Sequence, residues 1–187
     1  KAKLIGLIGH ARVGKSTAAE YLAEEHGFIR VKLSDTFKDM MRSMLSDTGY
    51  SDADVERMIE GDLKDTNMAV LGGKSPRAVM YMLGTKFGRE MLYDSVWVNI
   101  TRSKVAKLLD RGNSVVIEDI RRNNEAKMVR YDLGGKLLHI WRPGVNEKDP
   151  MDSCSQALLD NTIPSIMNTD IPQLYREVAY HAGVEHE

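Results

Sequence analysis

Gly9-His-Ala-Arg-Val-Gly14-Lys15-Ser16 is the stretch of sequence that decides the fold, because it matches the pattern G-x-x-x-x-G-K-S/T of a phosphate-binding loop. The apolar run Leu4–Ile8 precedes this loop and the helix-forming run Thr17–Leu22 follows it, so strand, loop and helix stand in the required order. Glycine allows backbone angles that turn successive N–H groups inward around phosphate oxygens, and the N-terminus of the next helix adds partial positive charge. We therefore predict a nucleoside triphosphate site, against the alternative of a glycine-rich turn without a ligand.

Two side chains of this loop are predicted to act on the nucleotide directly. Lys15 is expected to reach the β- and γ-phosphates, and the hydroxyl of Ser16 is expected to hold Mg²⁺. The loop residues expected to contact the nucleotide are Gly9, Arg12, Val13, Gly14, Lys15, Ser16 and Thr17.

Length and composition favour one globular domain over residues 1–187. With 187 residues, of which 42% are hydrophobic, the chain can bury one core, and no stretch resembles a linker between domains. The formal net charge of −1 lacks the basic excess of a general nucleic-acid binder. The apolar runs are too short to span a bilayer, and the single Cys154 fits a reducing compartment. We therefore expect a cytoplasmic protein without nucleic-acid or membrane partners.

Five short apolar runs are strand candidates, and the segments between them are long enough for helices. The candidates are Lys3–Ile8, Phe28–Lys32, Ser114–Ile117, Lys136–Trp141 and Ser165–Asn168. This alternation is typical of a parallel α/β sheet. Gly27, Gly112 and the pair Gly134-Gly135 each stand where a helix should end before the next strand begins.

The long stretch between the second and third strands, residues 35–111, is predicted to be a mostly helical insertion. Capping signals mark the starts of two of its helices. The predicted helices are Asp52–Glu60, capped by Ser51 with Asp54, then Ser75-Pro76 to about Phe87, and finally Asp94–Arg111. Because the phosphate loop holds only one nucleotide, we expect this insertion to provide the walls for a second substrate.

The apolar strand that ends in Glu118 and Asp119 is predicted to supply the acidic group that orients magnesium and its waters. We favour Asp119 over Glu118 for this role. The alternative is that Asp119 caps the helix predicted over Asn123–Asp132. Ligands of open α/β sheets collect beyond the carboxyl ends of strands, and Asp35, Asp119 and Arg142 all fall just after predicted strands.

Arginines follow this strand and also flank the middle helix of the insertion. Arg121, Arg122 and Arg130 lie where a lid over a transferred phosphate would need planar guanidinium groups, although each one alone is typical of a solvated helix face. Arg77 and Arg89 are placed so that both could face one anionic ligand. The alternative for this pair is a helix with ordinary surface arginines.

Taken together, these blocks resemble the phage-type deoxynucleoside monophosphate kinases, from about Leu4 to Leu174. Besides the phosphate loop, the matching blocks are Ser75-Pro-Arg77, Leu83-Gly-Thr85, Gly88-Arg89, Trp97 and Ile117-Glu-Asp119-Ile-Arg121-Arg-Asn-Asn124-Glu-Ala126. The resemblance implies an α/β P-loop kinase fold with a five-stranded parallel sheet flanked by helices, a helical acceptor-binding insertion and a short lid. It further implies transfer of the γ-phosphoryl group of ATP to a deoxynucleoside monophosphate, with Mg²⁺.

The resemblance also implies roles for individual residues. The implied catalytic residues are Lys15, Asp119, Arg121 and Arg130, and the implied magnesium ligands are Ser16 and Asp119. The implied acceptor contacts are Asp35, Lys38, Arg77, Arg89 and Trp97, although a tryptophan at this place is by its residue type more typical of a core. Asn168 and Thr169 would touch the adenine of ATP. The segment Met151–Leu159, which contains Cys154, is assigned no role.

Two alternatives to this function remain at the level of sequence. One is another small-molecule P-loop kinase, such as a kinase of a coenzyme precursor, and the other is a non-catalytic nucleotide-binding module. The GTPase signature Asn-Lys-x-Asp is absent, and a motor ATPase would normally need a longer chain. The expected partners are ATP and a deoxynucleoside monophosphate, in the host cytoplasm if the protein is encoded by a phage, and a homodimer is compatible with the sequence.

Overall fold

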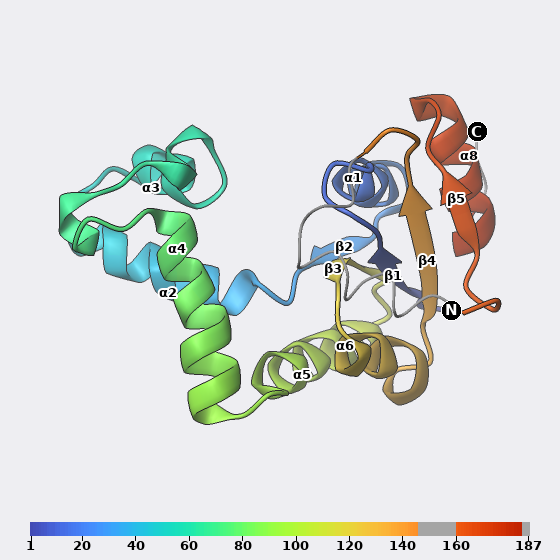
Figure 1. Ribbon diagram of the computed structural model, residues 1–187. Coiled ribbons are helices and arrows are strands. Elements are labelled where there is room, and N and C mark those ends of the chain that lie inside the picture. Colours follow the sequence, from blue (N-terminus) through green and yellow to red (C-terminus); the bar gives the residue numbers. More distant parts are fainter. Residues whose placement is uncertain (146–159, 185–187) are drawn as a thin grey trace. The chain divides into compact units, whose positions relative to one another are not determined.

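The computed structural model describes residues 1–145 and 160–184, which form two compact units. The first unit contains Lys1–Leu33 and Val98–Glu187, and the second contains Ser34–Trp97. The first carries the sheet and the second is helical (Figure 1). The segment Met151–Leu159 lies outside the described residues. Within the described ranges, none of the helices combines the length and apolarity needed to cross a bilayer.

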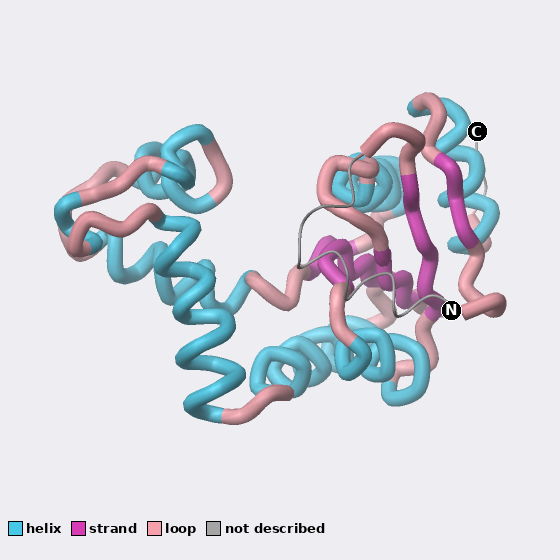
Figure 2. Tube along the Cα trace, in the orientation of Figure 1, coloured by secondary structure: helices cyan, strands magenta, loops and turns pink. Residues whose placement is uncertain are grey.

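The first unit is built on a five-stranded parallel sheet, as predicted (Figure 2). Its strands are β1 (Leu4–Ile8), β2 (Ile29–Val31), β3 (Val115–Ile120), β4 (Lys136–Trp141) and β5 (Ser165–Met167). Their order across the sheet is β2-β3-β1-β4-β5. All five predicted strands are confirmed, with ends that differ by a few residues.

One strand end differs in a way that matters for the site. The third strand was predicted to end at Ile117, but β3 continues to Ile120, which is fully buried and pairs with Ile8 after a shift in register. The expectation that Asp119 follows the strand is therefore wrong, because Asp119 lies within it. The strand is longer because the apolar Ile120 packs into the core beside β1.

Helices cover both faces of this sheet, and each face has its own apolar core. The helices are α1 (Lys15–His26), α5 (Val96–Asp110), α6 (Asn123–Lys127), the π-helix Met128–Asp132 that continues α6, and α8 (Ile171–Ala182). Helices α1 and α8 pack on one face, whereas α5 and α6 pack on the other (Figure 1). Successive residues of β1 alternate between the cores, with Ile5 and Leu7 in one and Leu4 and Ile8 in the other.

The predicted helix stops are confirmed. Gly27 ends α1 in the left-handed conformation, with φ of 66°, and its N–H donates to carbonyls of the last turn. Gly112 and Gly134 also have positive φ, at 83° and 63°, and each lies two residues beyond the end of its helix, α5 and the π-helix Met128–Asp132. Each of these glycines therefore turns the chain back toward the next strand.

The second unit packs short helices around a small core of its own. Its elements are α2 (Asp35–Ser46), α3 (Asp52–Ile59), the 3-10 helices Asp62–Asp65 and Ala69–Leu71, α4 (Pro76–Tyr81) and the π-helix Met82–Leu92. The core consists of Met41, Leu45, Val55, Met58, Ile59 and Met80. The hydroxyls of Ser51 and Ser75 accept the N–H groups of Asp54 and Ala78, which confirms both predicted caps.

The helix that begins at Pro76 extends beyond its predicted end near Phe87. It continues to Leu92 as a π-helix. The carbonyl of Gly84 accepts a hydrogen bond from the indole N–H of Trp97 at 2.7 Å, and Gly88 lies directly against the same ring. The local sequence pattern did not reveal this extension, because Trp97, which contacts Gly84 and Gly88 of the π-helix, lies outside the helix.

Candidate active site

The phosphate loop joins β1 to α1 in a conformation that requires glycine. Gly9 and Gly14 have φ of 147° and 107°, and Arg12 also has a positive φ of 66°. A Cβ on Gly9 would lie 2.1 Å from the carbonyl oxygen of Ile140 on β4, so no other residue fits there. The loop is consequently held tightly against the end of the sheet.

Lys15 crosses this loop. Its ammonium group donates to the carbonyl oxygens of Gly9 and His10, at 2.6 and 2.5 Å. The cation therefore lies over the loop whose backbone N–H groups, together with the start of α1, form the kind of concavity that binds phosphates. Ser16 is exposed in the first turn of α1, and Thr17 follows it half-buried. These residues fit the triphosphate of a nucleotide.

Asn168 is brought to the loop from the far end of the chain. It follows β5, is buried with 5% of its surface exposed, and its side-chain amide donates to the carbonyl oxygen of Val13 at 2.8 Å. Thr169 is exposed, and its hydroxyl bonds to the side chains of Asp170 and Gln173. The contact of Asn168 and Thr169 with adenine stays a prediction, and the contact of Asn168 with the loop is one that the sequence did not indicate.

The two carboxylates of β3 have different partners. Glu118 is buried, and its two oxygens accept hydrogen bonds from Arg30 Nε and Nη2 at 3.0 and 3.1 Å, with Lys32 Nζ at 3.7 Å. Asp119 is half-buried, and its Oδ1 accepts the N–H of Leu33 at 2.8 Å. Glu118 thus ties β2 to β3, and no sequence motif marked Arg30 or Lys32 as its partners.

The helix that follows has Arg122 as its N-cap, so Asp119 is not the N-cap residue. The buried carboxylate of Glu125 reaches back to the start of this helix, where it accepts the N–H groups of Arg121 and Arg122 at 2.7 and 3.0 Å. Asp119 precedes Ile120, which pairs with Ile8 at the end of β1, so the carboxylate lies at the same edge of the sheet as the phosphate loop. This position suits an acidic group that acts on bound phosphate and its cation.

Neither residue proposed to hold magnesium belongs to a preformed metal cluster. Across residues 1–145 and 160–184, no group of three or more His, Cys, Asp or Glu side chains is arranged to hold a metal ion. Magnesium in phosphate-transfer sites usually takes few protein ligands, with water and phosphate oxygens completing its shell. The oxygen donors of Ser16 and Asp119 are of the kind that Mg²⁺ prefers.

The predicted lid arginines occupy separate places. Arg121 is half-buried directly after β3. Arg130 lies in the π-helix that follows α6, where it bonds to Asp160 at 2.8 Å and to the hydroxyl of Thr162, with its guanidinium 5.6 Å from the ring of Tyr131. Hydrogen bonds from Thr162 and Arg130 lower the pKa of Asp160 to about 2. Arg130 is therefore engaged with a carboxylate that stays ionised at neutral pH.

Two of the predicted acceptor residues of the second unit, Lys38 and Arg77, are paired with carboxylates. Lys38, on α2, is buried and donates to Glu60 at 2.6 Å. Arg77 is exposed and forms a bidentate pair with Asp65 at 2.6 and 3.0 Å. Asp35, the first residue of α2, is half-buried.

Arg89 and Trp97 occupy more enclosed places in the same unit. The Arg89 side chain is only 10% exposed, and it donates to the carbonyl of Asp94 at 2.9 Å. Trp97 is in the core, where its ring meets Phe37 edge-on, with centroids 5.4 Å apart. Arg77 and Arg89 therefore have different partners, and Trp97 contributes to packing.

Lys64 is a cation that no motif marked. Burial lowers the pKa of its ammonium group, the charges of Lys38 and Arg77 lower it further, and Glu60 and Asp65 act in the opposite direction. The 3-10 helix that carries it packs against α3 and α4. Lys38 and Arg77, with their partners Glu60 and Asp65, are thus the charges that act on Lys64.

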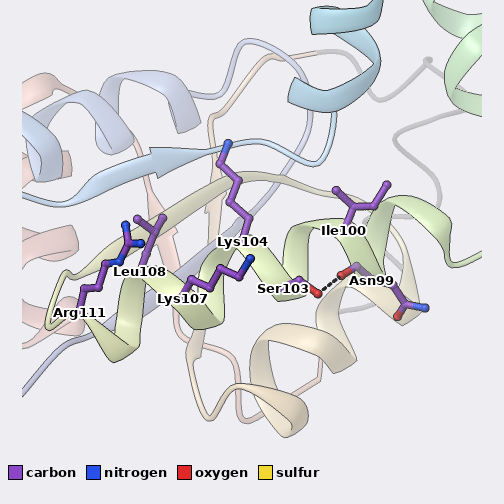
Figure 3. Close-up of a pocket in the computed structure, with 7 residues that line it drawn as sticks. All are labelled: Asn99, Ile100, Ser103, Lys104, Lys107, Leu108 and Arg111. Atoms are coloured by element: carbon purple, nitrogen blue, oxygen red, sulfur yellow. Dashed lines mark hydrogen bonds between the residues drawn. The ribbon is translucent and has the colours of Figure 1, made fainter.

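A surface depression on α5 is lined by none of these residues. Its cavity volume is about 620 Å³, and its lining comes from α5 and from Arg111, directly after that helix (Figure 3). The lining residues are Asn99, Ile100, Ser103, Lys104, Lys107, Leu108 and Arg111. None of them was predicted to take part in nucleotide binding.

Comparison with known proteins finds kinases that are similar to this chain in sequence and others that are similar in fold. No family model matches the chain. The chain is 28% identical over 186 residues to a protein of Acanthamoeba polyphaga mimivirus that is provisionally named a deoxynucleotide monophosphate kinase, covering 94% of this chain and 93% of that protein. It is 34% identical over 70 residues to the deoxynucleoside-5'-monophosphate kinase of Escherichia phage T5, covering 35% of this chain and 27% of that protein.

Solved structures share the fold at low sequence identity. The dephospho-CoA kinase of Campylobacter jejuni matches with a TM-score of 0.52 at 13% identity, covering 98% of this chain and 96% of that one. A sugar kinase from a Janibacter species matches with a TM-score of 0.50 at 13% identity, with full coverage of both chains.

The sheet and these neighbours define the fold as that of the P-loop kinases. The two viral relatives, both named as kinases, support a kinase enzyme. Within that class, its resemblance to the phage-type deoxynucleoside monophosphate kinases is confirmed by the two viral relatives.

Proposed function

We propose that this kinase transfers the γ-phosphoryl group of ATP to a deoxynucleoside monophosphate. The observation that carries the proposal is the similarity to the mimivirus protein over 94% of the chain, which includes the helical second unit as well as the phosphate loop. The loop alone would support only a nucleotide donor. The similarity of the second unit supports the kind of acceptor.

On the donor side, the loop would hold the triphosphate through its backbone N–H groups and Lys15. Ser16 and Asp119 would hold Mg²⁺, which when bound neutralises phosphate charge and orients the phosphates. Lys15 already spans the loop through Gly9 and His10, so little side-chain ordering is needed when phosphate replaces those carbonyls as its partner.

On the acceptor side, a phosphate monoester is largely dianionic at neutral pH, so its own oxygen can attack without a general base. What the chain must provide is placement and positive charge. Lys38, Arg77 and Arg89 would hold the acceptor, while Arg121 and Arg130 would stabilise the transferred group. For Arg77 and Arg130, binding would exchange a carboxylate partner, Asp65 or Asp160, for a phosphate.

The proposal is tested by measuring ADP release from Mg-ATP with a panel of acceptors. The panel contains every common ribo- and deoxynucleoside monophosphate, together with dephospho-CoA as a coenzyme precursor. We expect turnover with at least one deoxynucleoside monophosphate at a rate well above that with dephospho-CoA. Turnover with dephospho-CoA alone would establish the coenzyme-precursor alternative, and ATP binding without acceptor-dependent turnover would establish a non-catalytic module.

The matched control in this assay is Lys15→Ala. We expect kcat to fall by about 100-fold or more, because the charge that stabilises the transferred phosphate is lost while the loop's amides remain. Acceptor-dependent ADP release near the wild-type rate in this variant would contradict the assignment of the phosphate loop.

A further inference from the structure

Asn168 connects the end of the sheet to the phosphate loop. Its main-chain N–H donates to the carbonyl of Trp141 on β4 at 2.8 Å, which fixes the backbone where β5 ends. From there its buried side-chain amide donates to the carbonyl oxygen of Val13 at 2.8 Å. The side chain of Val13 is also buried, with 1% of the residue exposed.

The loop has room for this amide because position 14 is a glycine. Gly14 has φ of 107°, and a Cβ built on it would lie 2.4 Å from Asn168 Nδ2 and 3.3 Å from a methyl group of Leu174 on α8. The space that a side chain at position 14 would need is therefore occupied by Asn168. Glycine at this position serves the approach of the amide as well as the turn of the loop.

The contact determines where the next N–H group points. A trans peptide is planar, and its C=O and N–H groups point in opposite directions. Asn168 holds the carbonyl of Val13 toward β5, so the N–H of Gly14, in the same peptide plane, points away from Asn168. Gly14 directly precedes Lys15, the first residue of α1, so this N–H belongs to the group of amides that faces a bound phosphate.

We propose that Asn168 is a positioning residue of the phosphate loop, which orients the Val13–Gly14 peptide so that the Gly14 N–H is directed at the phosphates of the donor nucleotide. The role differs from the adenine contact that the resemblance implied. It concerns the donor alone, so it holds whichever acceptor the kinase uses.

The two roles are separated by binding probes that contain or lack a base. The affinities of Mg-ATP, Mg-GTP and Mg-tripolyphosphate are measured by calorimetry, without acceptor, for the wild type, Asn168→Ala and Asn168→Ser. We expect Asn168→Ala to weaken the binding of ATP and of tripolyphosphate by the same factor, roughly 10- to 100-fold, because the Val13 carbonyl loses its buried hydrogen-bond donor. Asn168→Ser provides a hydroxyl donor in place of the amide, so its affinity for these probes should lie between those of the wild type and Asn168→Ala.

Asn113→Ala is the matched control. It removes an amide that also donates to a backbone carbonyl, that of Leu108 at 3.2 Å, after the end of α5. Its thermal unfolding reports the general cost of losing such a bond, and its affinity for tripolyphosphate should equal that of the wild type. A second readout is hydrogen exchange of the peptide spanning residues 9–16, which should be faster in Asn168→Ala than in either the wild type or Asn113→Ala.

Three results would overturn the proposal. The first is a loss of ATP affinity in Asn168→Ala with tripolyphosphate unchanged, which would assign the residue to the base. The second is unchanged affinity for all three probes. The third is an equal loss of tripolyphosphate affinity in Asn113→Ala. If Asn168→Ala does not fold, Asn168→Ser decides the question by the same comparison. A chain without phosphotransfer to nucleoside monophosphates would contradict the proposed function but leave these binding results intact.

Discussion

At the scale of single residues, neighbouring carboxylates on one strand have separate tasks. Glu118 and Asp119 are adjacent, yet strand geometry turns their side chains to opposite faces of the sheet. Arg30 takes both oxygens of Glu118, and the N–H of Leu33 bonds to Asp119 at the edge that also carries the phosphate loop. A carboxylate already shared with a guanidinium is less suited to orienting a metal ion.

This difference predicts opposite outcomes for two isosteric substitutions. Asp119→Asn should lower kcat at saturating Mg-ATP with little change in thermal stability, because a charge is lost but the hydrogen bond to Leu33 can be kept. Glu118→Gln should leave kcat close to that of the wild type and reduce stability by about 1–3 kcal/mol, because Arg30 loses its ionic partner. Steady-state kinetics over a range of Mg²⁺, together with thermal unfolding, measure both effects. If Glu118→Gln proves the more damaging to kcat, the assignment of Asp119 is wrong.

At the scale of elements, the π-helix Met82–Leu92 packs directly against Trp97. The indole N–H donates a hydrogen bond to the carbonyl of Gly84, and a Cβ on Gly88 would lie 2.3 Å from the ring. Gly84 is less constrained, since its Cβ would meet the ring of Phe37 at 3.2 Å. The two glycines therefore differ in how much a methyl group should cost.

We expect Gly88→Ala to destabilise the second unit by about 1–3 kcal/mol through overpacking, and Gly84→Ala to cost less. The change should be visible in the fluorescence of Trp97, measured in a Trp141→Phe background so that one tryptophan reports. Chemical unfolding followed by this signal gives the stability of both variants. Equal stabilities for the two variants would show that Trp97 can move out of the way of the added methyl group.

At the scale of the whole molecule, the proposed function assigns the donor to the sheet unit and the acceptor to the helical unit. Arg77 and Arg89 belong to the helical unit, and the phosphate loop belongs to the sheet unit. Changing Arg77 or Arg89 to Lys keeps the charge but removes the planar pair of donors that suits a phosphate. These substitutions should therefore affect the nucleoside monophosphate and not ATP.

For Arg77→Lys and Arg89→Lys we expect a higher apparent KM for the nucleoside monophosphate, a lower kcat if the contact tightens in the transition state, and unchanged calorimetric affinity for ATP. Varying each substrate in turn separates these quantities. Arg89→Lys should be the more severe, because the Arg89 side chain is 10% exposed and that of Arg77 is 61% exposed. An effect on ATP alone, or on neither substrate, would return both arginines to a structural role.

Stability of the molecule should also depend on pH through His139 on β4. Burial lowers the pKa of His139, and the neighbouring His10 and Lys15 lower it further. Below about pH 6.5 the unfolded chain binds a proton that the folded chain resists, so stability should fall as the pH drops through this range and rise again with pH. Thermal unfolding between about pH 7.5 and about pH 5.5 measures the slope. His139→Gln should flatten it, whereas an unchanged slope would exclude His139 as its source.

Much of the fold was predictable because its signals are local. The strands alternate with helical segments, glycines end the helices, and Ser51 and Ser75 cap theirs, since each of these features depends on residues within one or two turns of the chain. The phosphate loop was predictable for the same reason, because its glycines and Lys15 all lie within residues 9–16.

Tertiary structure alone decided the contacts between distant segments. Asn168 reaches Val13 across 155 positions, and Arg30 reaches Glu118 across 88, because strand order in a parallel sheet places these ends side by side. The π-helix likewise contacts Trp97, which lies beyond it in the chain. Sequence by itself thus determined the elements and the chemistry of the loop. The contacts that residues around the loop make with distant segments follow instead from which strands pair, and no local sequence pattern specifies that pairing.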